Sequence, residues 1–122
     1  MNRAHKKLDV WKESVALATD IYKLTNCFPK YEMYGLVSQI RRAAVSVPSN
    51  IAEGAARNSD KEFAHFLSIA GGSLSELDTQ VEIASNLGYA TDEAKEAIDH
   101  KIAAISAKLA GLIANIRKRI VT

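Results

Sequence analysis

The sequence has little cysteine or proline and no long apolar run. Cys27 is the only cysteine, which excludes an intrachain disulfide and a thiol-rich metal site and fits a reducing compartment. Two prolines leave most of the chain free to form helices. No apolar run approaches the roughly 18 residues of a membrane span, and no apolar segment follows the basic N-terminus as in a secretory signal. These absences predict a cytoplasmic protein without a membrane segment.

The sequence also lacks the motifs of common enzyme classes. It has no glycine-rich phosphate loop after a strand, no zinc-spaced cysteine and histidine cluster, and no nucleophile beside a base. The Glu-x-x-His pattern of di-iron bundles occurs once, at Glu62 and His65, with Glu96, Asp99 and His100 as further potential ligands. Helical geometry turns Glu62 and His65 away from the core and separates His65 from His100 by about 20 Å. We therefore expect no enzyme, no cofactor and no metal site.

Apolar residues at helical spacing are the main feature that is present. With 48% hydrophobic and 25% charged residues, 122 residues suffice for one domain with its own core. The spacing predicts helices over residues 8–25, 31–56 and 59–88, and a fourth from residue 91 onwards. We expect an all-α, antiparallel up-down-up-down four-helix bundle over residues 1–122, with short flexible tails at both ends.

The first predicted helix is apolar over more than one face. The stripe that we place in the core consists of Leu8, Trp11, Val15, Ala18 and Tyr22. A second apolar set lies beside it and consists of Val10, Leu17, Ile21 and Leu24. Together they exceed the roughly 100° arc that a surface helix of a monomer needs. The surplus predicts a surface for a partner.

The second predicted helix contains Pro48. Proline in a helix interior removes a backbone donor and costs roughly 3 kcal/mol. Because the apolar stripe keeps its phase from Val47 to Ile51, we predict a kink, with Ser46 and Ser49 satisfying the freed backbone groups. The alternative is a break, with a new helix starting at Pro48.

Polar residues and glycines mark the limits of the last two helices. A turn is expected from Gly54 to Ser59, and Ser59 with Glu62 forms a capping box. Gly88 is the predicted C-terminal cap of the third helix, and Thr91 is the predicted N-cap of the fourth.

Gly71 and Gly72 lie in the middle of the third predicted helix. Each costs roughly 1 kcal/mol there relative to alanine. The pair predicts a close approach of a neighbouring backbone.

A polar stripe flanks the core face of the second helix and continues on the third. Its members are Gln39, Arg42, Ser46, Asn50, Glu53, Ser73 and Glu76. We predict buried hydrogen bonding between helices or protomers, with ligand recognition and plain solvation as alternatives. For Arg42, a salt bridge or hydrogen bond to Glu53, Glu76 or a neighbouring protomer is favoured over a phosphate contact.

Charge is segregated along the chain. Residues 1–57 carry nine basic and five acidic side chains, residues 58–99 carry two and nine, and residues 100–122 carry five and none. An antiparallel bundle gathers at one end Arg3, Lys6, Lys7, Arg57, Lys61, Arg117, Lys118 and Arg119. Phosphate contacts there would give affinity for nucleic acid without sequence choice. The alternative is a pair of solvated basic tails.

Two stretches resemble the four-helix-bundle family named for proteins encoded in intervening sequences of 23S ribosomal RNA genes. They are FPKYEMYGLVSQIRRAAVSVPSNIAEGAAR, from Phe28 to Arg57, and EFAHFLSIAGGSLSELDTQ, from Glu62 to Gln80. The resemblance implies a bacterial homopentamer without enzymatic activity. The family includes the accessory protein of diversity-generating retroelements, which binds nucleic acid and a reverse transcriptase. The motif residues of the family correspond here to Gln39, Arg42, Ser46, Pro48, Asn50, Glu53, Gly54, Arg57, Ser73 and Glu76.

From the residues and the resemblance together, we expect a non-enzymatic homo-oligomer that binds RNA or DNA through basic surfaces of the assembly. The alternative is a protein-interaction or scaffold module, whose first helix binds another protein.

Overall fold

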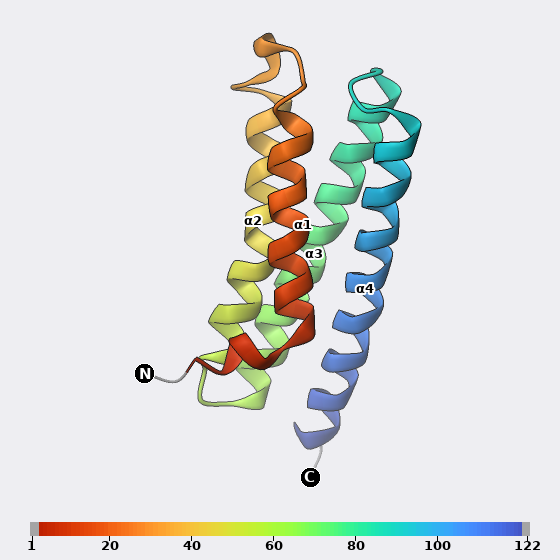
Figure 1. Ribbon diagram of the computed structural model, residues 1–122. Helices are drawn as coiled ribbons and strands as arrows, with labels where there is room; N and C mark the ends of the chain where they lie inside the picture. The colour runs from red at the N-terminus through yellow and green to blue at the C-terminus, as the bar shows by residue number, and fades with distance from the viewer. Residues whose placement is uncertain (1–2, 121–122) are drawn as a thin grey trace.

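The computed structural model describes residues 3–120 and contains four long helices (Figure 1). α1 spans Asp9–Thr25, α2 spans Leu36–Ala55, α3 spans Asp60–Asn86 and α4 spans Asp92–Ile120, with short 3-10 turns η1 at Ala4–Lys7 and η2 at Lys30–Glu32. Residues 3–120 contain no strand, which confirms the prediction of an all-α four-helix bundle. No helix in this range is long and apolar enough to cross a membrane. The outermost residues of the expected tails, 1–2 and 121–122, lie outside the described residues.

The two ends of the bundle are built from different segments (Figure 1). The α1–α2 and α3–α4 connections lie at one end, and the α2–α3 connection lies at the other end together with both termini. α2 packs on α1 and α3, and α4 packs on α3 and α1. Lys101 of α4 pairs with Asp20 of α1, and Lys108 pairs with Glu13. In this register α1 and α4 run in opposite directions.

The core of the bundle is aliphatic. Its buried apolar side chains are valine, leucine, isoleucine and alanine, apart from Phe28 and Pro48. α1 contributes Val10, Leu17 and Ile21. Val15 and Tyr22, which the sequence analysis placed in the core, are 39% and 44% exposed, so that part of the prediction is wrong.

The buried face of α1 was misjudged because it also carries hydroxyl groups. Ser14 and Thr25 are each 1% exposed. The Ser14 hydroxyl donates to the Val10 carbonyl at 2.6 Å, and the Thr25 hydroxyl donates to the Ile21 carbonyl at 2.8 Å. A hydroxyl satisfied inside its own helix enters a core without a large desolvation penalty. A face of α1 that contains such hydroxyls can therefore be buried as readily as the stripe that we placed in the core.

α2 begins at Leu36, later than the predicted start at residue 31. Gly35 has φ −112° and ψ −108°, which is not helical, and residues Lys30–Glu32 form η2 instead. The Leu36 amide donates to Oε1 of Glu32 at 3.4 Å. The Glu32 carboxylate therefore accepts from the first amide of α2 from outside the helix, where the apolar spacing predicted a further helical turn.

α2 continues through Pro48, which is buried. The alternative of a break at this residue is therefore wrong, and a bend at Pro48 stays a prediction. The hydroxyl of Ser46 does not bond to the α2 carbonyl that lacks its donor; it lies 2.9 Å from the hydroxyl of Ser73 on α3. Burial of Pro48 against the rest of the bundle favours the continuous helix.

The predicted ends of α3 and α4 agree with the structure. Ser59 accepts from the Glu62 amide at 3.1 Å, and its hydroxyl donates to the Glu62 carboxylate at 3.2 Å. At the other end Gly88 has φ +79°, and the Tyr89 amide donates to the Ala84 carbonyl at 3.0 Å. This is a Schellman cap, in which glycine adopts the left-handed conformation at low cost. Thr91 caps α4 by accepting from the Ala94 amide at 3.1 Å.

The close helix approach occurs at Gly54 instead of Gly71 and Gly72. A Cβ atom at Gly71 or Gly72 would meet no atom within 4 Å, so the approach predicted there is wrong for this chain. At Gly54 a Cβ atom would lie 2.7 Å from Cβ of Phe66 and 3.2 Å from the carbonyl oxygen of Phe63. Gly54 is buried inside α2, so the turn that was predicted to begin there starts after Ala55.

Candidate functional site

Four segments that carry eight basic residues lie at the end of the bundle that holds the termini (Figure 1). The segments are η1 with the residue before it, the exit of α2, the first turn of α3 and the last turn of α4. All eight residues are exposed. We call this surface the basic end, and it consists of Arg3, Lys6, Lys7, Arg57, Lys61, Arg117, Lys118 and Arg119.

Few carboxylates neutralise the basic end. Within the described residues, Arg57 pairs with Glu53 at 3.1 Å and Arg119 pairs with Asp60 at 3.7 Å, and all four side chains are at least 40% exposed. Exposed pairs of this kind contribute about 0–1 kcal/mol and exchange readily. The guanidinium of Arg57 also lies 4.7 Å from the centre of the Phe66 ring. These cations are therefore accessible to a phosphate.

Lysines along the side of α4 differ from those of the basic end because each faces a carboxylate. Lys95 lies 2.5 Å from Asp99, Lys101 pairs with Asp20, and Lys108 pairs with Glu13. The hydrogen bond to Asp99 raises the pKa of Lys95 despite partial desolvation, and the hydrogen bond to Glu13 raises the pKa of Lys108. Together with the further pair of Lys95 and Glu82, these pairs bind α4 to itself, to α1 and to α3.

Three members of the predicted polar stripe form a hydrogen-bonded network between α2 and α3. The Ser46 and Ser73 hydroxyls lie 2.9 Å apart, and the Asn50 side-chain amide donates to Oγ of Ser46 at 2.9 Å and to its carbonyl at 2.8 Å. All three side chains are half-buried. This network links the middle of α2 to the middle of α3.

The other members of the polar stripe lie apart from this network. Gln39, Arg42 and Glu76 are exposed and line a cleft between α2 and α3. Glu53 is exposed and bonds to Arg57. Within residues 3–120 no ion pair joins Arg42 to Glu53 or to Glu76.

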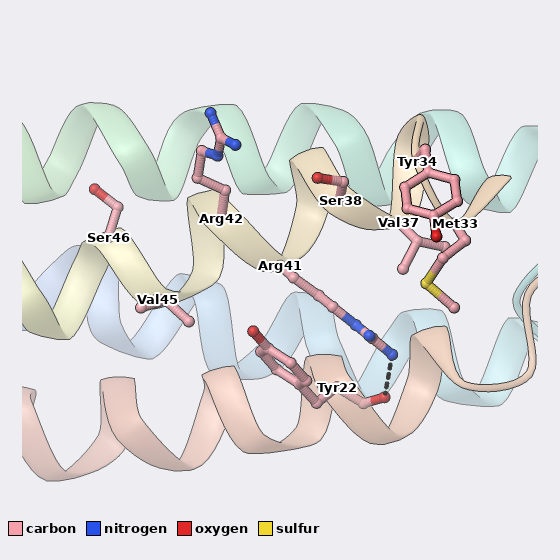
Figure 2. A pocket seen from close by; sticks show the side chains of 9 residues that line it. All are labelled: Tyr22, Met33, Tyr34, Val37, Ser38, Arg41, Arg42, Val45 and Ser46. Atoms are coloured by element: carbon pink, nitrogen blue, oxygen red, sulfur yellow. Dashed lines mark hydrogen bonds between the residues drawn. The ribbon is translucent and has the colours of Figure 1, made fainter.

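Arg41 forms a clamp that sequence reasoning missed, and Figure 2 shows its side chain reaching from α2 to Tyr22 on α1. Its Nε donates to the Thr25 hydroxyl at 2.9 Å and its Nη2 donates to Oδ1 of Asn26 at 3.1 Å, while the guanidinium lies 4.6 Å from the centre of the Tyr22 ring. Arg42 points to the opposite side, towards α3 (Figure 2). Adjacent helical residues diverge by about 100°, and this divergence was the available signal that the two arginines have different roles.

An apolar groove runs along the junction of α1 and α2. Its wider part, of about 620 Å³, is shown in Figure 2 and contains Tyr22, Met33, Tyr34 and Val45. A narrower part of about 360 Å³ shares Tyr22 and Val45 and adds Val15. Tyr34 is 97% exposed, and the other four side chains are 39–44% exposed. We call this surface the α1–α2 groove; it contains the surplus apolar residues of α1.

The far end of the bundle is closed by a tyrosine and carboxylate cluster. The Tyr89 hydroxyl donates to Oε2 of Glu32 at 2.8 Å and lies 3.3 Å from the Tyr31 hydroxyl. These hydrogen bonds, the Tyr31 one first, and the negative charge of Glu32 raise the pKa of Tyr89 well above its usual range. The cluster joins η2 to the α3–α4 connection.

Potential metal ligands do not converge in the described part of the chain. Residues 3–120 hold no group of three or more histidine, cysteine, aspartate or glutamate side chains arranged for a metal ion. Glu62 and His65 are exposed, and His100 lies 3.9 Å from Glu96, its neighbour one turn away.

A comparison with protein-family models gives one informative result. The model described as "23S rRNA-intervening sequence protein" matches residues 6–111. The chain belongs to this family. Both stretches that carried the resemblance lie inside the matched range. Arg3 lies before this range and Arg117, Lys118 and Arg119 lie after it, so four of the eight residues of the basic end fall outside the region that the chain shares with the family model.

A solved structure supports the fold assignment of this chain. It is a crystal structure of a protein with unknown function from the S23 ribosomal protein family of Bacteroides thetaiotaomicron VPI-5482. The two chains are 25% identical with a TM-score of 0.80, and the match covers 86% of this chain and 95% of the other. A comparison with curated proteins gives no match.

Proposed function

We propose that this protein is a non-enzymatic, self-associating bundle of the cytoplasm that binds RNA or DNA through its basic end. The observation that carries the proposal is the convergence of eight exposed basic side chains from four separate segments. Two of the eight have a carboxylate partner within the described residues, and both of those pairs are solvent-exposed.

Phosphate neutralisation is the chemistry that such a surface supports. Lysine and arginine side chains release counterions when they contact a nucleic-acid backbone, which gives affinity without reading the base sequence. The hydrogen-bonded network between α2 and α3 and the Arg41 clamp lie outside the basic end, and we assign neither of them a role in binding phosphate.

Self-association would multiply the basic end. The α1–α2 groove exposes five large apolar side chains, three on α1 and α2 and two in the segment between η2 and α2, and such patches mark interaction surfaces. We propose a second copy of this chain as the occupant, in a closed ring; the family resemblance favours five protomers. A ring places equivalent basic ends on one rim, where several weak phosphate contacts act together.

A salt series with matched variants tests nucleic-acid binding. Affinity for a single-stranded RNA and for a duplex DNA is measured by fluorescence anisotropy at increasing salt. Removing two cations from the basic end, with K6A and K7A together, should lower the affinity at low salt. The same change should reduce the salt slope by about 0.9 for each duplex phosphate that the variant no longer neutralises.

The matched control removes two exposed lysines from the other end, with K23A and K30A together. Equal decreases of affinity in the two double variants would mean that net charge and not the basic end drives binding. If the wild-type protein binds neither nucleic acid, the result favours the alternative function, a protein-interaction or scaffold module.

A further inference from the structure

Phe66 on α3 is a half-buried aromatic side chain that lines a pocket at the basic end. The other two phenylalanines of the chain serve the hydrophobic core, since Phe28 is buried and Phe63 packs against the core cluster. Cβ of Phe66 lies so close to Gly54 of α2 that a methyl group added there would approach it to 2.7 Å. Contact with α2 therefore fixes where the Phe66 side chain begins, while its ring borders the pocket.

The guanidinium of Arg57 covers the Phe66 ring. Its central carbon lies 4.7 Å from the centre of the ring, and its Nη2 donates to Oε1 of Glu53 at 3.1 Å. The Arg57 side chain is nevertheless 40% exposed. A guanidinium over a phenyl ring is a cation–π pair, and a planar guanidinium also stacks on flat aromatic groups. We call this pair the Arg57–Phe66 platform.

The pocket beside the Arg57–Phe66 platform has a volume of about 390 Å³. It is lined by Arg57, Lys61, Glu62, His65 and Phe66. The imidazole of His65, which is exposed, has its centre 5.7 Å from that of the Phe66 ring, with an angle of 71° between the two planes. Three flat groups therefore border the pocket, and none of its residues lines the α1–α2 groove.

We propose that this pocket takes an unpaired base of a single-stranded nucleic acid, which stacks on the guanidinium of Arg57 and contacts the imidazole of His65. Aromatic rings and arginine guanidinium groups are the surfaces on which unpaired bases stack. The proposal rests on the proposed function, because the other cations of the basic end hold the phosphates of the strand. It adds a preference for single strands, since a base in a duplex is already stacked and has to be flipped out before it can enter.

The carboxylate of Glu62 favours a base over a phosphate inside the pocket. Glu62 belongs to the capping box of α3 and accepts from the Ser59 hydroxyl at 3.2 Å. Its negative charge repels a phosphate and does not repel a neutral base. Lys61, which also lines the pocket, is a cation for the neighbouring phosphate of the strand.

Fluorescence anisotropy with two matched single strands tests the proposal. One is oligothymidylate of about 12 nucleotides, and the other has the same number of phosphates but abasic tetrahydrofuran residues in place of the nucleosides. We expect the thymidylate to bind at least about fivefold more tightly, because one stacked base contributes that much or more. Equal affinity for the two strands would overturn the base pocket while phosphate binding by the basic end stands. If neither strand binds, this proposal and the proposed function both fail.

Arg57→Lys separates stacking from charge. The substitution keeps the positive charge and removes the planar guanidinium, so it should weaken thymidylate binding by at least about fivefold and leave binding of the abasic strand and of a duplex unchanged. The salt slope should equal that of the wild type, because stacking releases no counterions. Arg42→Lys, the same change at an exposed position outside the basic end, should bind all three nucleic acids as the wild type does. Thymidylate affinity that is equal in R57K and wild type would overturn the proposal.

Phe66→Leu removes the ring beneath the guanidinium and keeps an apolar side chain. It should weaken thymidylate binding by at least about fivefold, whereas Phe66→Tyr, which keeps a ring, should bind as the wild type does. Phe63→Leu is the matched control, since Phe63 packs against the core and lies outside the pocket. Circular dichroism establishes that the variants are folded. Equal weakening by F63L and F66L would mean that the loss reflects packing and not stacking, and would contradict the proposal.

Discussion

At the scale of single residues, Gly54 sets the distance between α2 and α3. A methyl group at this position would lie 2.7 Å from Cβ of Phe66, an atom fixed to the α3 backbone that a rotamer change cannot move. We predict that Gly54→Ala lowers the free energy of unfolding by about 2 kcal/mol, because overpacking of this kind outweighs the roughly 1 kcal/mol that alanine gains in helix propensity. Urea denaturation followed by circular dichroism measures the change.

Gly72 is the matched control for Gly54. It lies inside α3, and a Cβ atom there meets nothing within 4 Å. Gly72→Ala should raise the free energy of unfolding by up to about 1 kcal/mol. A similar loss of stability in both variants would mean that Gly54 does not act through its contact with α3.

Tyr89 gives a residue-scale prediction about pH. Its pKa is raised by hydrogen bonds to Tyr31 and Glu32 and by the negative charge of Glu32, so the folded state holds this phenol proton more tightly than the unfolded chain does. The stabilisation is complete below the ordinary tyrosine pKa of about 10 and is lost as the pH rises through the folded-state pKa. Ultraviolet absorbance should show one of the four tyrosines ionising at higher pH than the rest.

Tyr89→Phe should remove that late ionisation while the aromatic ring keeps its place beside Phe28, whose centroid lies 5.4 Å away. Tyr34→Phe is the control, since Tyr34 is 97% exposed. If the ionisation at the highest pH persists in the Tyr89→Phe variant, it belongs to another tyrosine.

At the scale of elements, the Ser46 and Ser73 hydroxyls connect α2 to α3 at 2.9 Å. We predict that S46A and S73A, alone and combined, give a coupling free energy of about 1 kcal/mol in a double-mutant cycle, the usual net value of one hydrogen bond. Denaturation midpoints of the four proteins measure it. S75A, at an exposed position of α3, replaces S73A in the control cycle and should show no coupling.

Much of the helical framework was predictable because it depends on local signals. Ser59, Gly88 and Thr91 act through hydrogen bonds and backbone conformations within a few residues of themselves. The buried face of α1 and the start of α2 were not predictable in this way. They depend on which of two apolar stripes meets the neighbouring helices and on a carboxylate that caps Leu36 from outside the helix.

Prediction of the candidate sites was limited for the same reason. The gathering of the basic end follows from charge segregation and antiparallel helices, and both were visible in the sequence. The Arg57–Phe66 platform and the Arg41 clamp depend on contacts between segments that no sequence spacing records. The polar stripe was predicted as one unit, yet tertiary packing places Ser46, Asn50 and Ser73 in a network and the rest at the surface.

At the scale of the whole molecule, the α1–α2 groove leads to a prediction about assembly. Val45 is 42% exposed and lines both parts of the groove. In the proposed ring, Val45→Glu should leave the helix content unchanged and shift the native mass from oligomer towards monomer, because a charge in an apolar interface is left without a partner. Native mass spectrometry and analytical ultracentrifugation measure the shift.

Ile83→Glu provides the matched control for this assembly test. Ile83 is 45% exposed, lies on α3 and is absent from the groove. It should keep the oligomer intact. Dissociation by both variants would indicate that the interface extends beyond the groove or lies elsewhere.

Charge is segregated along α4, which contributes an electric dipole along the bundle. The carboxylates of α4 occupy its first turns, at Asp92, Glu93, Glu96 and Asp99, whereas its last turn carries three cations. At 1.5 Å per residue, these groups are separated by about 27 Å, from Asp99 to Arg117, to about 40 Å, from Asp92 to Arg119. In the field of a polyanion, the resulting torque turns the basic end towards the polyanion before any contact forms. Added salt screens the field and weakens that torque. Encounter with a polyanion is therefore end-on from the outset.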